Sequence, residues 1–329
     1  MDPLSALRQV ALRLERAGEP AYRVRAFRRA ADVVGALAAG ELERRVEEGT
    51  LTDLHGIGES TAGVVVDAPA GREPSYLSRF REAVPVGGRE LRAALKGDCH
   101  AHSDWSDGGS PIREMAEAAR DLGHSWMALT DHSPRLTVAN GLSADRLRRQ
   151  LEVVAELNAE LAPFLVLTGI EVDVLDDGAL DQREDLLAQL DVVVASVHSK
   201  LRMPAPEMTA RVVAAVSNPH VDVLGHCTGR LVTGKGRPES EFDAVEVFAA
   251  CVGNGTAVEV NSRPERRDPP GRLLRLAVDM GCDFAIDSDA HAPGQLDWVD
   301  YGCERAEECG VTPDRVINTL GAAELLSRR

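Results

Sequence analysis

Short apolar runs follow one another through residues 97–329, separated by longer stretches with helical spacing. The runs of strand length are residues 126–129, 164–167, 192–196, 221–224, 257–260 and 284–286, with a shorter run that enters His100. Between them, Ser110 is expected to cap a helix that starts at Pro111, and Ser143 to cap a longer one. This alternation predicts an α/β domain with seven parallel strands.

The first part of the chain has a different pattern. Apolar positions recur at helical spacing through residues 1–66, and residues 22–31 continue this spacing with four arginines. Prolines and glycines then favour a linker at residues 67–96, with one short helix around residues 76–83. We therefore expect a small all-α domain, a linker and the α/β domain at residues 97–329.

A glycine-containing turn in the helical segment is a candidate nucleic-acid contact. Gly56-Ile57-Gly58 resembles the helix-hairpin-helix motif, whose glycines let backbone N–H groups at a helix start approach a phosphate. An ordinary tight turn between helices explains the same three residues. The neighbouring arginines favour phosphate contact, and the residues expected to bind DNA are Arg23, Arg25, Arg28, Arg29, Gly56 and Gly58.

The net charge of −16 is distributed unevenly along the chain. Residues 1–96 contain 15 Lys and Arg against 14 Asp and Glu, whereas the remainder contains 22 against 39. The overall acidity therefore does not argue against a nucleic-acid partner for the first segment. Bound cations would offset part of the acidity of the second segment, although a solvated acidic surface accounts for most of it.

The sequence shows neither a membrane-spanning pattern nor a disulfide framework. No apolar run approaches the ~20 residues of a bilayer span, and the N-terminus lacks the apolar centre of a signal peptide. The six cysteines have no C-x-x-C spacing and are spread through a long chain, which favours buried thiols. We expect a cytoplasmic protein without a membrane partner.

Six of the nine histidines stand in short motifs with acidic neighbours, each at the end of an apolar run. The motifs are His100-Ala101-His102-Ser103, Thr130-Asp131-His132, Ser196-Val197-His198, Leu224-Gly225-His226 and Ser288-Asp289-Ala290-His291, with Gly169-Ile170-Glu171 between the second and third. A single His-x-His pair often only satisfies core hydrogen bonds. Because the carboxyl ends of parallel strands converge on one face of a barrel, six such motifs predict a multi-metal site.

The motifs, in this order through residues 97–325, resemble those of the PHP (polymerase and histidinol phosphatase) superfamily of metal-dependent phosphoesterases. The resemblance implies a distorted seven-stranded β/α barrel that holds three divalent ions, of zinc, manganese or iron. The implied ligands are His100, His102, Asp289 and the bridging Glu171 for the first metal, His198, His226 and Glu171 for the second, and Asp107, His132 and His291 for the third.

Three positions near these motifs have alternative interpretations. The third-metal ligand assigned to Asp107 stands at a position that varies between His and Asp in the family. Asp104 competes with Asp107 for this role. Cys227 stands where the family commonly has proline, so it either touches the second metal site or fills a small buried space. Asp131 is expected to orient His132 or to pack nearby rather than to bind metal.

The residue types suit phosphate ester hydrolysis. Clustered divalent ions can hold a phosphate and lower the pKa of a bound water, so no protein nucleophile is required. The predicted catalytic residues are Glu171, Asn261 and Arg230. We expect Asn261 to hydrogen-bond at the reaction centre and Arg230 to bind phosphate. Two basic loops suggest substrate binding, although charges that are merely solvated explain them equally well. One loop contains Arg230, Lys235 and Arg237, and the other contains Arg263, Arg266 and Arg267.

The N-terminal segment resembles the helical lyase-type domain that opens family X DNA polymerases, through residues 22–31 and 51–58. Bacterial members of that family end in a PHP domain. Residues 67–96 are too few for a polymerase palm, so we predict no nucleotide polymerisation. Lyase chemistry needs a lysine amine, and residues 1–95 contain no lysine.

A DNA-binding module joined to a phosphoesterase predicts a metal-dependent nuclease or DNA-end-processing enzyme, similar to a 3'-5' exonuclease. The alternative is a small-molecule phosphomonoesterase of the histidinol-phosphatase type, with the helical module as a scaffold. A third interpretation is a non-catalytic DNA-binding protein, against which the open-sided ligand set argues. The partner is thus DNA or a phosphorylated small molecule, and the sequence leaves the oligomeric state open.

Overall fold

The protein divides into two compact units, Met1–Val84 and Pro85–Arg329. The computed structural model describes residues 2–70, 76 and 85–328. The predicted linker, residues 67–96, extends across this division, so its last part belongs to the second unit. Apart from Tyr76, the short helix expected at residues 76–83 lies outside the described residues.

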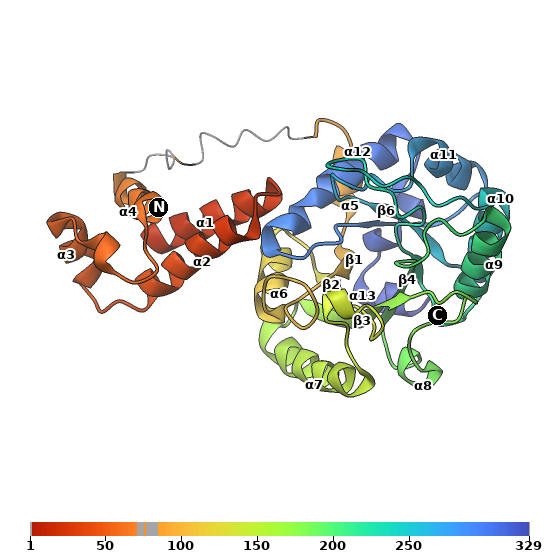
Figure 1. The fold of residues 1–329 in the computed structure, drawn as a ribbon, viewed down its shortest axis with the longest axis horizontal. Coiled ribbons are helices and arrows are strands. Elements are labelled where there is room, and N and C mark those ends of the chain that lie inside the picture. The colour runs from red at the N-terminus through yellow and green to blue at the C-terminus, as the bar shows by residue number, and fades with distance from the viewer. Residues whose placement is uncertain (1, 71–75, 77–84, 329) are drawn as a thin grey trace. The chain divides into compact units, whose positions relative to one another are not determined.

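The first unit is helical in its described part (Figure 1). Its elements are α1 (Pro3–Arg16), α2 (Ala21–Gly35), α3 (Glu41–Glu48), the 3₁₀ turn η1 (Leu51–Asp53), α4 (Glu59–Asp67) and the 3₁₀ turn η2 (Ala68–Ala70). Asp2 caps α1 by accepting a hydrogen bond from Ser5 N at 3.0 Å. The apolar stripe of α1 is buried against Phe27 of α2 and Val65 of α4, which forms the core of this unit.

The second unit contains a seven-stranded parallel sheet in which strands follow one another in chain order. The strands are β1 (Gly97–Ala101), β2 (Trp126–Leu129), β3 (Leu165–Asp173), β4 (Val192–Ser196), β5 (Val223–Leu224), β6 (Ala257–Asn261) and β7 (Phe284–Asp287). A parallel bridge between Ala101 and Ala290 brings the first and last strands together, so the sheet is a nearly closed barrel. The predicted fold class is thereby confirmed.

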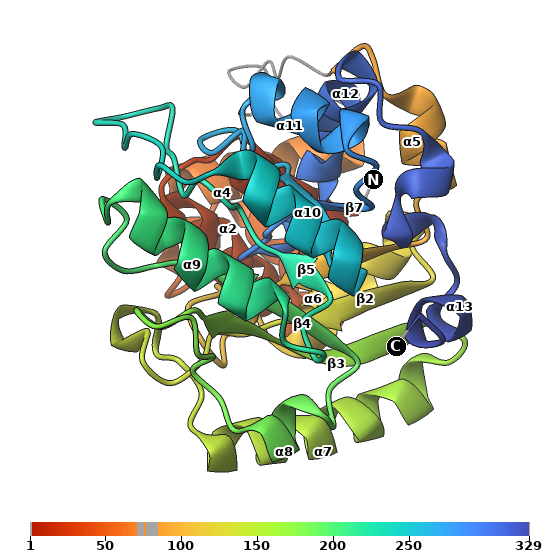
Figure 2. The same cartoon turned by 90° about the vertical axis from the view of Figure 1, so that its right-hand side faces the viewer.

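Helices surround the barrel, most of them on its outside, while α13 (Ala322–Leu326) packs through Leu325 against the interior layer (Figures 1 and 2). They are α5 (Arg89–Ala94), α6 (Ile112–Asp121), α7 (Ala144–Leu161), α8 (Glu184–Leu187), α9 (Ala205–Val216), α10 (Ala244–Asn254), α11 (Gly271–Asp279), α12 (Val299–Glu308) and α13 (Ala322–Leu326). Short 3₁₀ turns lie in the connections: η4 (Thr137–Ala139), η5 (Pro293–Trp298), η6 (Pro313–Arg315) and η7 (Ile317–Thr319).

The two predicted helix caps have different outcomes. Ser143 caps α7 as expected, since its hydroxyl accepts a hydrogen bond from Arg146 N at 3.3 Å. The prediction for Ser110 is wrong. Pro111 has extended backbone angles and itself occupies the N-cap of α6, so the helix begins one residue later than expected. The Ser110 hydroxyl is buried without a hydrogen-bond partner among the described residues.

Apolar side chains fill the amino-terminal half of the barrel interior. Each strand contributes to this layer, whose members are Cys99, Trp126, Ala128, Leu167, Val192, Val194, Val223, Ala257 and Ala285. Ile317 and Leu325, from the carboxyl-terminal segment, pack against it. At Gly97, a Cβ atom would lie 2.1 Å from the Trp126 ring, so only glycine fits beside that side chain. The polar side chains of the interior therefore gather at the opposite, carboxyl ends of the strands.

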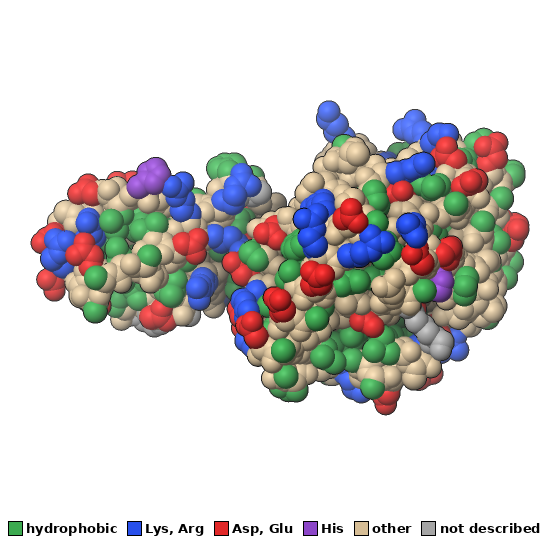
Figure 3. Space-filling view, turned by 90° about the horizontal axis from the view of Figure 1, so that it is seen from below, with side chains coloured by type: hydrophobic (Ala, Val, Ile, Leu, Met, Phe, Trp, Pro, Cys, Tyr) green, Lys and Arg blue, Asp and Glu red, His purple; other side chains and the backbone are tan. Residues whose placement is uncertain are grey.

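Charged side chains of both signs cover the surface. On the face seen in Figure 3 they are interspersed rather than separated into large fields of one sign. Many pair within a helix, as Arg44 does with Glu41 and Glu48 on α3. In the part of the chain that the structure describes, no helix combines the length and the apolar character needed to cross a bilayer.

Candidate metal centre

Glu171, on the carboxyl half of β3, lies at the centre of the histidine cluster. Its side chain is 1% exposed, and both carboxylate oxygens face imidazole nitrogens. Oε1 is 2.9 Å from Nε2 of His226 and 3.2 Å from Nε2 of His198. Oε2 is 2.8 Å from Nδ1 of His132, 3.3 Å from Nε2 of His100 and 3.6 Å from Nε2 of His102. One carboxylate thus joins five histidines from four strand ends or the loops that follow them.

A second group forms around Asp107, in the loop after β1. Its Oδ1 is 3.3 Å from Nε2 of His291 and 3.5 Å from Nε2 of His132. The rings of His102 and His291 lie 4.2 Å apart, which completes this group. Asp104 and Asp107 are both exposed, but among the described residues Asp107 belongs to a set of converging ligand atoms and Asp104 does not. The geometry therefore favours Asp107 as the carboxylate of this group.

Three sets of side chains offer ligand atoms that lie within 4.8 Å of one another. They are His102, Asp107, His132 and His291; His100, His102 and Glu171; and His132, Glu171 and His198. Two histidines, His102 and His132, therefore each belong to two sets, whereas the resemblance assigned each histidine to one metal. This arrangement makes the three sets one continuous centre rather than separate sites.

Asp289 lies at the edge of this centre and is held by cations. Its Oδ1 is 3.6 Å from Nε2 of His102, but Oδ2 is 3.1 Å from Nε of Arg266. Nη1 of Arg263 is 3.4 Å from Oδ1, and Asn261 donates a hydrogen bond to Oδ2 at 2.9 Å. Burial opposes ionisation of Asp289, but Arg263, His100 and Arg266 outweigh it and hold its pKa well below the usual range.

The buried nitrogens of the centre fit a bound metal. Nε2 of His100 and Nε2 of His102 have no hydrogen-bond partner among the described residues, although both side chains are fully buried. Unsatisfied buried nitrogens are costly unless a ligand binds them. Burial opposes ionisation of Glu171, but His132, His198 and His100 keep its pKa well below the usual range. Imidazoles around an ionised carboxylate form a donor set for divalent ions.

Two carboxylates behind the histidines were missed by the sequence analysis. Oε1 of Glu259 on β6 is 2.6 Å from Nδ1 of His100, and Oδ1 of Asp173 on β3 is 3.4 Å from Nδ1 of His198. Such partners orient a metal-binding imidazole and fix the nitrogen that carries the proton. A signal was present, because Asp173 follows Glu171 at the two-residue spacing of one strand face.

Asp131 and Cys227 occupy supporting positions. Asp131 accepts hydrogen bonds from Ser103 N at 2.8 Å, from the Ser106 hydroxyl at 2.5 Å and from Gln150 Nε2 at 2.6 Å. It therefore holds the loop that carries Asp107 and packs beside His132, the second role expected for it. Cys227 is 7% exposed, and its Sγ lies 3.7 Å from Oδ1 of Asp268.

In addition to Glu171, two side chains were predicted to be catalytic, Asn261 and Arg230. Both make contacts that orient neighbouring residues. Asn261 is fully buried and donates hydrogen bonds to Glu259 as well as to Asp289, so it orients these carboxylates. Arg230 donates through Nε to Arg266 O at 3.1 Å and also contacts the carbonyl of Arg267. Its guanidinium thus supports the loop after β6 at the edge of the centre.

The arginines expected to bind DNA differ in their surroundings. Arg25 and Arg29 are exposed on α2. Arg23 is paired with Glu19, and Arg28 lies 2.8 Å from the buried carboxylate of Glu15.

The two glycines expected beside them form the turn before α4. Gly56 has a φ of +107°, and a Cβ there would lie 2.9 Å from Nε of Arg29. Gly58 is the N-cap of α4, and its N–H donates to the Thr61 hydroxyl at 2.9 Å. Arg29 and the turn therefore lie side by side, while the N–H of Gly58 is already engaged.

Clustered imidazoles and carboxylates at the carboxyl end of a parallel α/β barrel are the arrangement of a metal-dependent enzyme. Residues 98–263, just over half of the chain, match the family model described as PHP domain. The chain therefore belongs to the PHP family, as its motifs indicated.

The chain is also similar to individual proteins. The chain is 41% identical over 249 residues to DNA polymerase/3'-5' exonuclease PolX of Bacillus subtilis, a match that covers 76% of this chain and 42% of that protein. It is 29% identical over 233 residues to a "probable phosphatase" of Thermoanaerobacter sp. (strain X514), covering 68% of this chain and 89% of the relative. A crystal structure of histidinol phosphate phosphatase from Lactococcus lactis, complexed with zinc, L-histidinol and phosphate, aligns with a TM-score of 0.49 and 19% identity, over 66% of this chain and 95% of that one.

Proposed function

We propose that the protein is a metal-dependent nuclease that cleaves phosphodiester bonds of DNA. The observation that carries the proposal is the 41% identity to a protein named as a polymerase and 3'-5' exonuclease. Identity to the probable phosphatase is 29%. This chain spans only 42% of the length of the exonuclease. We therefore propose nuclease action only for the two units that this chain contains.

Metal ions in the centre would hold the phosphate and lower the pKa of a water molecule that attacks it. The chain's own residues would position these ions. Glu171 would contact two of the ligand sets, and Glu259 and Asp173 would keep the rings of His100 and His198 in one orientation. Arg263 and Arg266 would keep Asp289 ionised at the edge of the centre.

The helical unit would bind the DNA backbone without reading sequence. Arg25 and Arg29 are exposed on α2, and Arg29 lies beside Gly56. A pocket of about 370 Å³ adjoins this turn and is lined by Tyr22, Arg23 and Phe27, among others. These side chains offer cationic and aromatic contacts to a nucleic-acid strand.

The test is manganese-dependent degradation of end-labelled single-stranded and primer-template DNA by the full chain. The control is the His100→Ala variant, whose folding is checked by circular dichroism. Shortened products that the variant does not make support the proposal, and their end label shows the polarity. DNA that stays intact with a metal-loaded protein would contradict it.

The second candidate is a phosphomonoesterase that acts on small molecules. The match to a probable phosphatase favours it, because this match covers 89% of that relative. It predicts that p-nitrophenyl phosphate is hydrolysed equally well when Arg25 and Arg29 are both replaced by Gln. Nuclease action predicts that the same double replacement weakens DNA cleavage.

A further inference from the structure

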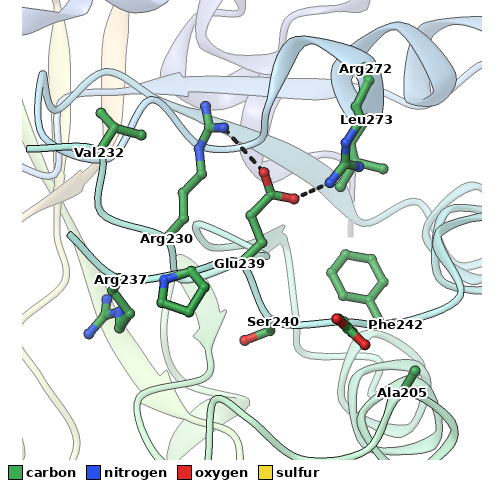
Figure 4. A pocket seen from close by; sticks show the side chains of 11 residues that line it. Ala205, Arg230, Val232, Arg237, Glu239, Ser240, Phe242, Arg272 and Leu273 are labelled. Atoms are coloured by element: carbon green, nitrogen blue, oxygen red, sulfur yellow. Dashed lines mark hydrogen bonds and ion pairs between the residues drawn. The ribbon is translucent and has the colours of Figure 1, made fainter.

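A large pocket lies on the carboxyl side of β5 and β6, beside the metal centre. Its volume is about 710 Å³, within the range of roughly 300–1,000 Å³ typical of small-ligand sites. The loop after β5 forms one wall, and the first residues of α9 and α11 form another (Figure 4). Its lining residues include Arg230, Val232, Arg237, Glu239, Phe242, Arg272 and Leu273.

The pocket connects to the metal centre through the loop that follows β6. Arg230 lines the pocket and donates a hydrogen bond to the carbonyl of Arg266. The side chain of Arg266 then reaches Asp289 at 3.1 Å. Asp289 lies 3.6 Å from the ring of His102. The loop after β6 therefore contacts both the pocket and the metal centre.

One carboxylate occupies the place between two of the pocket's cations. Figure 4 shows the Glu239 carboxylate between the guanidinium groups of Arg230 and Arg272. Its Oε1 is 3.4 Å from Nη1 of Arg230, and Oε2 contacts Nη2 of Arg272. The planar forks of two arginines suit a phosphate as well as a carboxylate. A phosphate of a bound ligand can replace Glu239 there.

Arg237 adds donors that the protein does not use. Its Nε donates to Gly229 O at 2.5 Å, while its two terminal nitrogens make no hydrogen bond or ion pair with any residue the structure describes. Burial and, to a lesser extent, the nearby charge of Arg266 lower the pKa of Arg237, while Asp268 acts in the opposite direction. The first turns of α9 and α11 add partial positive charge.

The rest of the lining combines the polar Ser240 and Glu241 with apolar side chains. Phe242 and Leu273 lie across the pocket from Val232 and Arg237 (Figure 4). An aromatic ring beside arginines is the combination that binds a nucleobase together with its phosphate. A small phosphomonoester held at the metals would leave this volume unfilled.

We propose that this pocket binds the nucleotide next to the scissile phosphate of a DNA strand. The phosphate of that nucleotide lies among Arg230, Arg237 and Arg272 in place of Glu239, and its base lies against Phe242 and Leu273. This inference rests on the proposed nuclease function and adds the second subsite of the same substrate. It predicts that Glu239 competes with the substrate, so its removal strengthens binding.

The test compares initial rates on the trinucleotide TpTpT, in which a second phosphate lies one nucleotide from the scissile one, and on p-nitrophenyl phosphate, both with manganese. We expect Arg272→Gln and Arg237→Gln each to raise the ratio of the KM for TpTpT to the KM for p-nitrophenyl phosphate about fivefold, with little change in kcat. Glu239→Gln should lower this ratio. Arg275→Gln is the matched control, because Arg275 is exposed one turn further along α11 and does not line the pocket.

The possible outcomes distinguish a failure of the pocket inference from a failure of the nuclease proposal. If the unaltered protein cleaves TpTpT and the Arg272 and Arg237 variants keep its KM ratio, the pocket inference is overturned and the nuclease stands. If the unaltered protein cleaves neither TpTpT nor DNA, the nuclease proposal fails, and calorimetric titration with thymidine 5'-monophosphate decides on the pocket. Weaker binding by Arg272→Gln than by Arg275→Gln would support the pocket, and equal binding would overturn it.

Discussion

Oε1 of Glu259 lies 2.6 Å from Nδ1 of His100, while Nε2 of the same ring lies 3.3 Å from Glu171. The imidazole is thus held between a carboxylate behind it and the bridging carboxylate in front. All three side chains are at most 1% exposed, so water does not compete for these contacts. A proton on Nδ1 that is shared with Glu259 leaves Nε2 free to bind a metal.

Replacing Glu259 by Gln should therefore weaken metal binding without removing a metal ligand. We expect the affinity for manganese to fall about 10- to 100-fold, because the amide does not fix the ring as the carboxylate does. The measurement is a manganese titration followed by calorimetry, with Glu308→Gln as an exposed control. Equal affinities in the two variants would show that Glu259 has no orienting role.

Replacing Arg25 and Arg29 by Gln should weaken DNA binding by the full chain. Each exposed arginine that neutralises a phosphate contributes roughly one unit to the slope of log affinity against log salt concentration. We expect that slope, measured by fluorescence anisotropy with labelled DNA, to decrease by about one per residue replaced. An unchanged slope would place the DNA contact elsewhere.

Arg28 should behave differently from its neighbours, because it binds Glu15 and not only solvent. Glu15 is 3% exposed, and the shortest distance to Arg28 is 2.8 Å. Arg28→Ala should lower the free energy of unfolding by about 1–2 kcal/mol, since it removes a partner of a buried carboxylate. Arg25→Ala, on the exposed face of the same helix, should change it by less than about 0.5 kcal/mol. Urea unfolding monitored by circular dichroism measures both, and similar losses would contradict this assignment.

His124 should make the protein sensitive to acid. Burial and the nearby charge of Arg92 lower its pKa to about 4. An unfolded histidine has a pKa of about 6.5, so the unfolded chain takes up this proton first as the pH falls. The contribution of neutral His124 to the free energy of unfolding is fully present above about pH 6.5 and is lost as the pH falls toward 4. The loss reaches about 2 kcal/mol at pH 5.

To test this, the free energy of unfolding is measured for the unaltered protein and for His124→Gln at about pH 7.5 and pH 5, in the presence of a metal chelator. The variant should lose about 2 kcal/mol less between the two values. The comparison cancels the other histidines, which both proteins share. Equal losses would mean that His124 titrates normally in the folded state.

The barrel and its ligands could be predicted from local patterns. The predicted strands at residues 126–129 and 192–196 coincide with β2 and β4, because a buried parallel strand is a continuous apolar run. β3 continues past the predicted residue 167 to Asp173, since Glu171 and Asp173 are polar but lie inside the barrel. Polar residues in a strand interior hide its end from a hydrophobicity pattern, and this is where the site lies.

Contacts across the barrel could not be predicted. Glu259 and His100 are 159 positions apart, and only the closure of the sheet brings them together. The pairing of Asp289 with Arg266 likewise depends on the path of the loop after β6. The start of α6 depended on the backbone angles of Pro111, which a capping pattern alone does not specify.

We attribute the proposed hydrolysis to divalent metals clustered at Glu171. Inductively coupled plasma mass spectrometry gives the metal content of the full chain, and DNA cleavage is measured on the same samples. We predict more than one divalent ion per chain, and a parallel loss of ions and cleavage both on chelation and in Glu171→Gln, with manganese restoring only the unaltered protein. Cleavage that survives complete removal of the metals, or a Glu171→Gln variant that keeps its metals and its activity, would show that hydrolysis does not depend on metals bound at Glu171.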